Sequence, residues 1–270
     1  MPRRRLCLSP ASGGPIRTHR DTPATLLRHG AAARDKGGVI KVASYNMRKS
    51  IGTDRRRRPE RTLQVLNEID ADIIALQEAD RRFGTRAAVL TAALLAEHSD
   101  WKAVPVNLRA RSMGWHGNAL LVRKSATILD CAPLHLPALE PRGAVMADIE
   151  IGGQAIRVVG MHLDLSGLWR RRQAAAILAE LAARERRLPT VMMGDLNEWT
   201  ANGGCLRDFG ERFAFAETGK TYHARRPMAR LDRIMVTGDI AIAGSGTHES
   251  LQARTASDHL PIWAELRVAQ

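Results

Sequence analysis

Cysteine is scarce in this sequence. The 270 residues contain only three, Cys7, Cys131 and Cys205. They lie far apart, and their spacing matches no zinc-binding or redox motif. We therefore expect three inert thiols in a protein that resides in a reducing compartment.

Long apolar runs are also absent. No stretch approaches the roughly 18 to 20 apolar residues that a membrane-spanning helix requires. Three arginines stand near the beginning, but residues 6–15 are too short and too rich in Ser, Gly and Pro for the apolar part of a secretory signal. We therefore expect a cytoplasmic protein. The sequence leaves its oligomeric state open, with a monomer as the simplest expectation.

Acidic residues are outnumbered by basic ones. Asp and Glu total 28 against 41 Lys and Arg, which gives a net charge of +13. The first 38 residues hold eight basic and two acidic side chains, a net charge of +6, which leaves +7 for the rest. This balance favours a polyanionic partner, either nucleic acid or an anionic lipid surface.

The same division separates two regions of the chain. Residues 1–38 have neither helical nor strand periodicity and are dominated by Pro, Gly, Arg and Ala, which predicts a basic, disordered extension. Regular patterning begins at Val39. Residues 39–270 are long enough to form a single domain with a sizeable core.

The most informative stretch is residues 190–199, TVMMGDLNEW. A nearly all-apolar run ends at Gly194 and is followed at once by Asp195 and Asn197. A buried strand with a polar end is how an α/β fold delivers side chains to a site at the edge of its sheet. A carboxylate beside a carboxamide suits a reacting phosphate, but Gly, Asp and Asn also form ordinary turns, so both interpretations stay open here.

The same pattern recurs along the chain. Short apolar runs are followed or preceded by polar side chains at five further places: Asn46, Glu78, His162, Asp232, and Asp258 with His259. Glu78 follows the predicted strand 73–76, and a glutamate at such a position is a suitable oxygen ligand for Mg²⁺. Taken singly, each polar residue also fits a solvated strand end.

Periodicity predicts the remaining elements. Strands are expected at 39–46, 101–106, 118–123, 127–134, 144–151 and 155–162, the last two joined by a Gly-Gly hairpin. Helices are expected at 59–69, 86–97 and 168–187. In the third helix, Leu168, Ala175, Leu178 and Leu181 are predicted to face inward.

Six segments in this order resemble a known family: SYNMR, LQEAD, GMHLDL, MMGDLNE, LDRIMV and SDHLPI. They are similar to motifs of the endonuclease/exonuclease/phosphatase superfamily, also called the DNase I-like fold, and they cover the chain from about Val39 onward. The resemblance implies an α/β fold, a four-layer sandwich in which two mixed β-sheets pack face to face with helices outside. The active site would lie where loops of both sheets converge.

The resemblance also implies roles for the candidate residues. Glu78 would be the main Mg²⁺ ligand, with Mn²⁺ as an alternative ion, helped by Asn46 and Asp258. Asp195 would orient or deprotonate the attacking water, and Asn197 would hold a phosphoryl oxygen. The remaining catalytic residues would be His259, polarised by Asp232 or Asp258 and contacting the scissile phosphate, and His162, the second catalytic histidine.

Three functions are compatible with this sequence. The first is a Mg²⁺-dependent phosphodiesterase that acts on DNA or RNA, because the folded part is basic. The second is a phosphodiesterase or phosphatase that acts on phospholipid, GPI-lipid or phosphosugar head groups, for which exposed Trp115, Trp169 or Trp199 near the site would argue. The third is a non-catalytic scaffold that binds polyanions through its arginines, although no key acid or histidine is missing.

Overall fold

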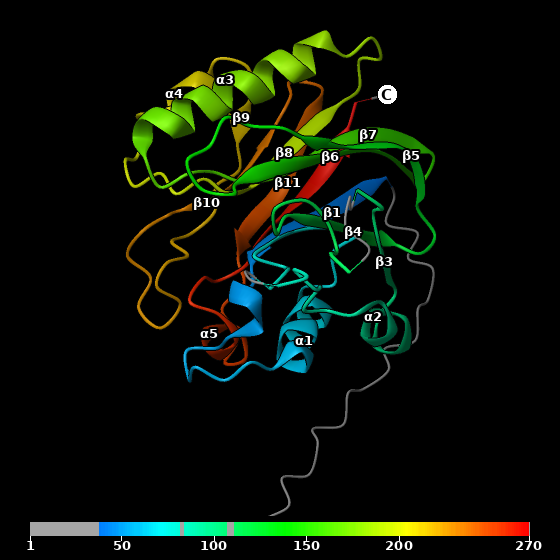
Figure 1. Ribbon diagram of the computed structural model, residues 1–270. Coiled ribbons are helices and arrows are strands. Elements are labelled where there is room, and N and C mark those ends of the chain that lie inside the picture. The colour runs from blue at the N-terminus through cyan, green and yellow to red at the C-terminus, as the bar shows by residue number, and fades with distance from the viewer. Residues whose placement is uncertain (1–37, 82–83, 107–110, 270) are drawn as a thin grey trace, which may run out of the picture.

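The computed structural model describes residues 38–81, 84–106 and 111–269. The extension predicted for residues 1–38 lies outside the described residues except for Gly38. Two six-stranded sheets pack against each other, and helices cover their outer faces (Figure 1). The predicted α/β sandwich with two mixed sheets is confirmed.

Each sheet contains one parallel pair among antiparallel neighbours. The first sheet has the order β11-β12-β1-β2-β4-β3, formed by Ile240–Thr247, Ile262–Val268, Val39–Asn46, Ile73–Gln77, Ala119–Arg123 and Trp101–Ala103. The second has the order β5-β6-β7-β8-β10-β9, formed by Thr127–Leu134, Gly143–Ile151, Gln154–His162, Thr190–Asp195, Asp232–Val236 and Ala214–Phe215. The parallel pairs are β1 with β2 and β7 with β8.

Three apolar clusters separate the four layers. The largest lies between the sheets, and Val191 and Met193 of β8 point into it, whereas Met192 between them points to the opposite face. This alternation buries both faces of one strand, which explains why the run reads as continuously apolar. The helices α1 (Pro59–Ile69), α2 (Ala92–His98) and α5 (Ala253–Ala256) cover the first sheet, and α3 (Gly167–Ala183) and α4 (Cys205–Gly210) cover the second (Figure 1).

Three predicted elements begin or end more than two residues from their expected bounds, and one of them is the helix expected at 168–187, which spans Gly167–Ala183. The helix expected at 86–97 begins only after Thr91, whose Oγ1 accepts a hydrogen bond from the Leu94 backbone N–H at 3.2 Å. An N-cap of this kind satisfies an otherwise unpaired helical N–H group and so sets the first turn. The strand expected at 101–106 is shorter, because β3 ends at Ala103 before Pro105.

The predicted inward face of α3 is wrong in part. Leu168 is 60% exposed, and the buried positions of the helix include Arg170 and Gln173. Arg170 is buried because it forms a salt bridge with Glu198 at 3.0 Å, and Gln173 because its Oε1 accepts the Asp164 N–H at 2.8 Å. Partner groups thus allow polar residues on the inner face, which a count of apolar residues misses. No helix in the described ranges is long and apolar enough to cross a bilayer.

Candidate active site

Polar side chains from separate strands meet at one edge of the second sheet. Parallel pairing of β7 with β8 places His162 beside Asp195, and antiparallel pairing of β10 with β8 places Asp232 on the other side of Asp195. The beginning of an antiparallel strand lies next to the end of its partner. This is why residues that end two strands and begin a third come together.

The first sheet contributes from the same edge. Asn46 ends β1 and Glu78 follows β2, while His259 stands before β12, which runs antiparallel to β1. The Nδ2 atom of Asn46 donates a hydrogen bond to Oδ2 of Asp195 at 2.9 Å, so one contact joins the two sheets across a separation of 149 residues. The predicted site residues of both sheets therefore form one cluster.

Asp195 lies at the centre of that cluster and is almost completely buried. Its Oδ2 atom is 3.3 Å from Nε2 of His162 and 3.8 Å from Nε2 of His259, and its Oδ1 accepts the backbone N–H of Asn197 at 2.9 Å. Burial opposes ionisation, but the charges of His259 and His162 hold the pKa of Asp195 well below its usual range. Asp195 is therefore a carboxylate at neutral pH.

Gly194 permits this approach of β8 to β7. A Cβ atom at this position would overlap the backbone of Met161, the neighbour of Gly194 in the parallel pairing. Glycine is the residue that lets two backbones come this close. The glycine of the GDLN segment therefore sets the distance at which His162 and Asp195 face each other.

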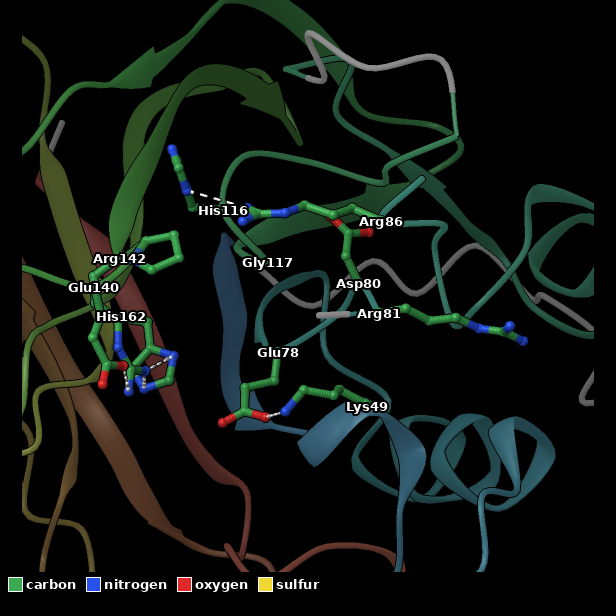
Figure 2. Close-up of a pocket in the computed structure, with 11 residues that line it drawn as sticks. Lys49, Glu78, Asp80, Arg81, Arg86, His116, Gly117, Glu140, Arg142 and His162 are labelled. Carbon is green, nitrogen blue, oxygen red and sulfur yellow. Dashed lines mark hydrogen bonds and ion pairs between the residues drawn. The ribbon is translucent and has the colours of Figure 1, made fainter. Parts of the chain in front are cut away.

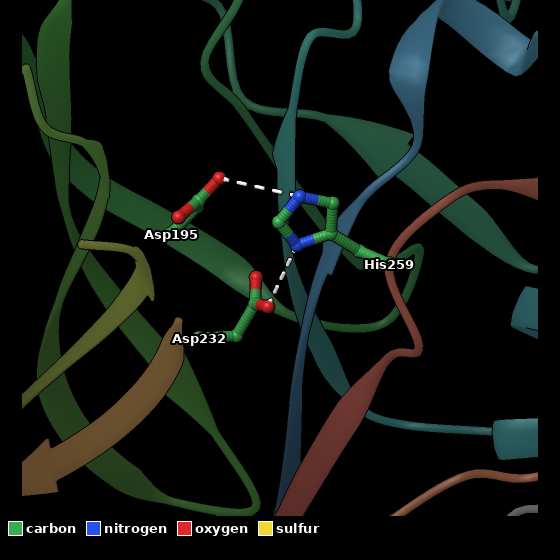
Figure 3. Close-up of side chains that lie close together, drawn as sticks. All are labelled: Asp195, Asp232 and His259. Atoms are coloured by element: carbon green, nitrogen blue, oxygen red, sulfur yellow. Dashed lines mark hydrogen bonds and ion pairs between the residues drawn. The ribbon is translucent and has the colours of Figure 1, made fainter. Parts of the chain in front are cut away.

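His259 is held between two carboxylates (Figure 3). Its Nδ1 atom lies 2.9 Å from Oδ2 of Asp232, and that same oxygen accepts the Thr221 hydroxyl at 2.6 Å. Although burial disfavours the charged ring, Asp232 and Asp195 raise the pKa of His259 to about 10. Burial raises the pKa of Asp232 in turn. The structure thus presents a charged imidazolium to the space beside Asp195.

Asp258 occupies a different position from its neighbour His259. The sequence left the partner of His259 open between Asp232 and Asp258, and the structure pairs His259 with Asp232. The Oδ2 atom of Asp258 instead lies 3.1 Å from Nε of Arg48. Ser257 anchors this segment to β1, since its hydroxyl donates to the Asn46 carbonyl at 2.7 Å.

Glu78 opens onto a cleft lined mostly by charged side chains, here called the Glu78 cleft (Figure 2). The Lys49 ammonium group contacts the Glu78 carboxylate directly, and His162 and Arg142 line the opposite wall. Burial opposes the charge on Glu78, but His162 and Lys49 lower its pKa. Glu78 is therefore an ionised carboxylate facing the predicted catalytic histidine.

Several site residues have backbones in the left-handed region. Glu78 and Asn197 have φ angles of 54° and 50°, and the three residues 48–50 after β1 have positive φ as well. Non-glycine residues adopt this region at an energetic cost and do so preferentially where geometry serves a function. Of these residues, Asn197 contacts Asp195 directly, and Glu78 and Lys49 contact each other in the Glu78 cleft.

Sequence reasoning missed four residues of the site. They are Lys49 beside Glu78, Arg142 with Nη1 2.9 Å from Nδ1 of His162, Thr221 on Asp232, and Tyr222, whose ring centroid is 5.0 Å from that of His259. Only Arg142 carries a local signal, because it stands directly before a strand in the segment EPRGAV. Lys49 appears in the sequence as one more residue of a basic loop.

A family model confirms the resemblance on which these predictions rest. The model of the Endonuclease/Exonuclease/phosphatase family matches residues 43–259, which include every predicted site residue. This chain belongs to that family. Members of that family hydrolyse phosphoester bonds and generally depend on a divalent metal.

Comparisons with individual proteins say less about this chain than the family model does. It is 31% identical over 164 residues to the uncharacterized protein YbhP of Escherichia coli (strain K12), which covers 57% of this chain and 64%, just under two thirds, of YbhP. Mannosyl-6-phosphatase of Bacteroides thetaiotaomicron is 19% identical, with a TM-score of 0.67 over 84% of this chain and 99% of the phosphatase. D. rerio TDP2 complexed with single-strand DNA product is 15% identical, with a TM-score of 0.65 over 85% of this chain and 99% of TDP2. At these identities the two solved structures establish the fold alone.

Proposed function

We propose that this chain is a Mg²⁺-dependent phosphodiesterase whose reacting phosphate binds between Asp195, His259 and Glu78. The observation that carries the proposal is the set of contacts around Asp195. A buried, ionised carboxylate touches Asn46 and Asn197 and faces two histidines. This arrangement places a carboxylate and two imidazole rings within reach of one bound group.

The residues divide the work of phosphoester hydrolysis. Asp195 accepts a hydrogen bond from the attacking water or removes its proton, because its lowered pKa keeps it ionised. His259, charged and fixed by Asp232, donates a hydrogen bond to a non-bridging phosphate oxygen and offsets its negative charge. Asn197 donates one amide N–H to the Leu163 carbonyl at 2.9 Å, and its second amide N–H serves a phosphoryl oxygen.

The donor set fits a hard divalent cation. Glu78 offers an ionised carboxylate and Asn46 a carbonyl oxygen, both from the edge of the first sheet, and Mg²⁺ favours one or two carboxylates with water and phosphate completing its shell. The Lys49 ammonium group contacts the Glu78 carboxylate, so a positive charge is already bound at the position proposed for the metal ion. When bound there, Mg²⁺ or Mn²⁺ would neutralise phosphate oxygens and stabilise the leaving alkoxide.

Asp258 fits the proposed ligand set less directly than Glu78 does. Its carboxylate is engaged by Arg48, so it would join the metal only after that salt bridge opened. A second cluster could also hold a metal ion by its geometry, because Asp195, Asp232 and His259 bring their ligand atoms within 4.8 Å of one another. We assign these three residues to water activation and phosphate binding, since His259 is protonated beside Asp232.

Nucleic acid is the first candidate substrate. The Glu78 cleft is lined by Lys49, Arg81, Arg86 and Arg142, which supports a polyanionic substrate whose neighbouring phosphates lie along the cleft. D. rerio TDP2, which shares the fold, was solved with a DNA product. The net charge of +13 points the same way.

A phospholipid head group is the second candidate, and a specific observation favours it. Of the three tryptophans singled out from the sequence, Trp199 is 64% exposed, whereas Trp115 packs against the central core and Trp169 lies under the guanidinium of Arg172. Trp199 stands two residues after Asn197, at the mouth of the site. An exposed tryptophan in that place is suited to an apolar or interfacial ligand.

A substrate panel tests the proposal. Hydrolysis would be measured with Mg²⁺ and with EDTA on single- and double-stranded DNA, RNA, phosphatidylinositol, phosphatidylglycerol and bis(p-nitrophenyl) phosphate. We expect Mg²⁺-dependent cleavage of at least one diester, lost by about a thousandfold in Asp195→Asn, because the base is removed while the shape is kept. Activity that is indifferent to both EDTA and Asp195→Asn would refute the proposed site. Polyanion binding without any turnover would favour the scaffold interpretation.

A further inference from the structure

Exposed apolar side chains stand on the segments that adjoin the strand ends of the second sheet where the site lies. Five of the large apolar residues that the structure exposes lie before β6, after β7 and at the start of α3, after β8 and before β10, and we call them the apolar rim: Leu139, Leu165, Leu168, Trp199 and Met228. Met228 is 67% exposed and Leu139 is 68% exposed. Single exposed apolar residues need no explanation, but a set on the loops that adjoin one functional site does.

Ring contacts and a backbone hydrogen bond connect the apolar rim to the residues around Asp195 and His259. The Trp199 ring centroid is 6.0 Å from that of Tyr222, and Tyr222 lies 5.0 Å from His259. The backbone N–H of Met228 donates to the Tyr222 carbonyl at 2.7 Å. Trp199 and Met228 therefore both contact Tyr222, which in turn contacts His259, the residue proposed to bind the phosphate.

The other side of the rim is connected through the loop after β7. The Leu139 backbone N–H donates to Oδ2 of Asp164 at 3.3 Å, and the Leu165 carbonyl accepts Nη1 of Arg170 at 2.6 Å. Arg170 also binds Glu198, which directly precedes Trp199. The buried Arg170–Glu198 ion pair thus fixes the backbone near Leu165 and Trp199, while the side chains of these two residues stay exposed to solvent.

Basic residues are interspersed with the rim. The segment 218–231, which leads into β10 and carries Met228, contains Lys220, Arg225, Arg226 and Arg230 and no acidic residue, and all four are exposed. Within the described ranges, none of these four forms a salt bridge. Figure 1 shows this segment as the yellow-orange loop at the left, on the side where α3 begins with Leu168 and the exposed Arg171 and Arg172.

This combination matches a charged membrane surface better than nucleic acid. Four of the five rim residues are leucine or methionine, which have no aromatic face for stacking on bases, whereas they gain free energy on entering the boundary between head groups and acyl chains. The surrounding arginines complement anionic head groups at the same depth. A lipid phosphoester lies at that depth too, so the side that binds the membrane would also present the site to its substrate.

We propose that the apolar rim docks this protein on the surface of an anionic phospholipid bilayer, with Met228 and Leu168 entering the interface. The inference rests on the proposed phosphodiesterase function and narrows its substrate class to phosphoesters carried at a lipid surface. Docking itself requires no turnover. It can therefore be measured in a variant that cannot hydrolyse the lipid.

Vesicle co-sedimentation of the full chain carrying Asp195→Asn tests the docking. Vesicles of phosphatidylcholine alone are compared with vesicles that also contain phosphatidylglycerol. We expect tight binding only to the anionic vesicles, weakened by salt because the basic residues contribute. Adding Leu168→Ser and Met228→Ser should lower the partition coefficient by about tenfold or more, since each buried Leu or Met side chain contributes on that order.

Leu129→Ser is the matched control. Leu129 is also exposed, at 39%, but it lies in β5, where the strand pairs with the end of β6 remote from Gly143 and the site. This control should bind vesicles like the parent, and circular-dichroism melting should show that all variants are folded. Equal binding of the rim variant and the parent would overturn the proposal.

A binding measurement with an oligonucleotide distinguishes a membrane-docking surface from a nucleic-acid-binding surface. If the rim variant loses affinity for a single-stranded oligonucleotide and the parent does not bind vesicles, the rim belongs to a nucleic-acid surface and the proposal fails. Failure of the proposed function has a different signature, because absence of Mg²⁺-dependent hydrolysis on every diester would leave the vesicle result intact. The two conclusions can therefore fail independently.

Discussion

Replacing Asp232 by Asn gives a sharp test of the site, because it removes a charge and keeps the shape. In the native structure Oδ2 of Asp232 lies 2.9 Å from Nδ1 of His259, and the two nearby carboxylates raise the pKa of His259 from 6.5 to about 10. That difference corresponds to a preference for the charged ring on the order of 5 kcal/mol, shared between Asp232 and Asp195. Asp232 is the closer and contributes the larger share.

The substitution should therefore lower the pKa of His259 by about two units or more. In the parent, His259 stays charged across the neutral range and loses its proton only as pH rises toward 10. In Asp232→Asn, the ring would become neutral near pH 7 to 8, about two units lower. Activity should then fall on the alkaline side of neutrality, while at pH 6 the loss should be smaller.

The measurement is the pH dependence of kcat/KM on bis(p-nitrophenyl) phosphate, with the His259 ring titrated by NMR. Asp130→Asn is a matched control, because Asp130 is exposed and pairs with Arg184 on the surface. An alkaline limb at the same pH in the variant and the parent would refute the account of His259. The thermal midpoint supplies an independent check. The raised pKa of His259 contributes stability that is fully present below pH 6.5 and is lost as pH rises toward 10, so the parent should lose more stability than the variant between these pH values.

Three further predictions concern single residues. Glu78→Gln should raise the Mg²⁺ concentration needed for half-maximal activity by about tenfold or more, because a carboxylate ligand is lost, and an unchanged Mg²⁺ titration would remove Glu78 from the metal site. Arg142→Ala should lower kcat/KM by about tenfold to a hundredfold, because the Arg142 guanidinium stands beside His162 in the Glu78 cleft. Arg142→Lys should restore part of the lost kcat/KM, because the positive charge is kept. Full activity of the alanine variant would contradict a substrate contact by Arg142. Gly194→Ala should lower the free energy of unfolding by about 3 kcal/mol or more, measured in urea, because a Cβ would overlap the Met161 backbone, and a variant as stable as the parent would show that β7 and β8 can separate there.

The sequence by itself determined which residues could meet. Strands 39–46 and 190–195 end in Asn46 and Asp195, and Glu78 directly follows strand 73–77. A strand's direction fixes which edge of the sheet its last residue reaches. The nearly all-apolar run before Gly194 likewise predicted a buried strand, which is β8. These features depend on residues close together in the chain, so their pattern is local and readable.

Only the tertiary structure decided which of these residues touch. Both Asp232 and Asp258 could have held His259, and the antiparallel pairing of β10 with β8 selects Asp232 while Arg48 takes Asp258. Lys49 and Arg142 entered the site in the same way, through packing between segments far apart in sequence. The inner face of α3 was misread because Arg170 is buried by a partner 28 residues away, Glu198, that periodicity cannot anticipate. Contacts across the fold depend on the distances at which whole sheets and helices pack, and no local pattern encodes them.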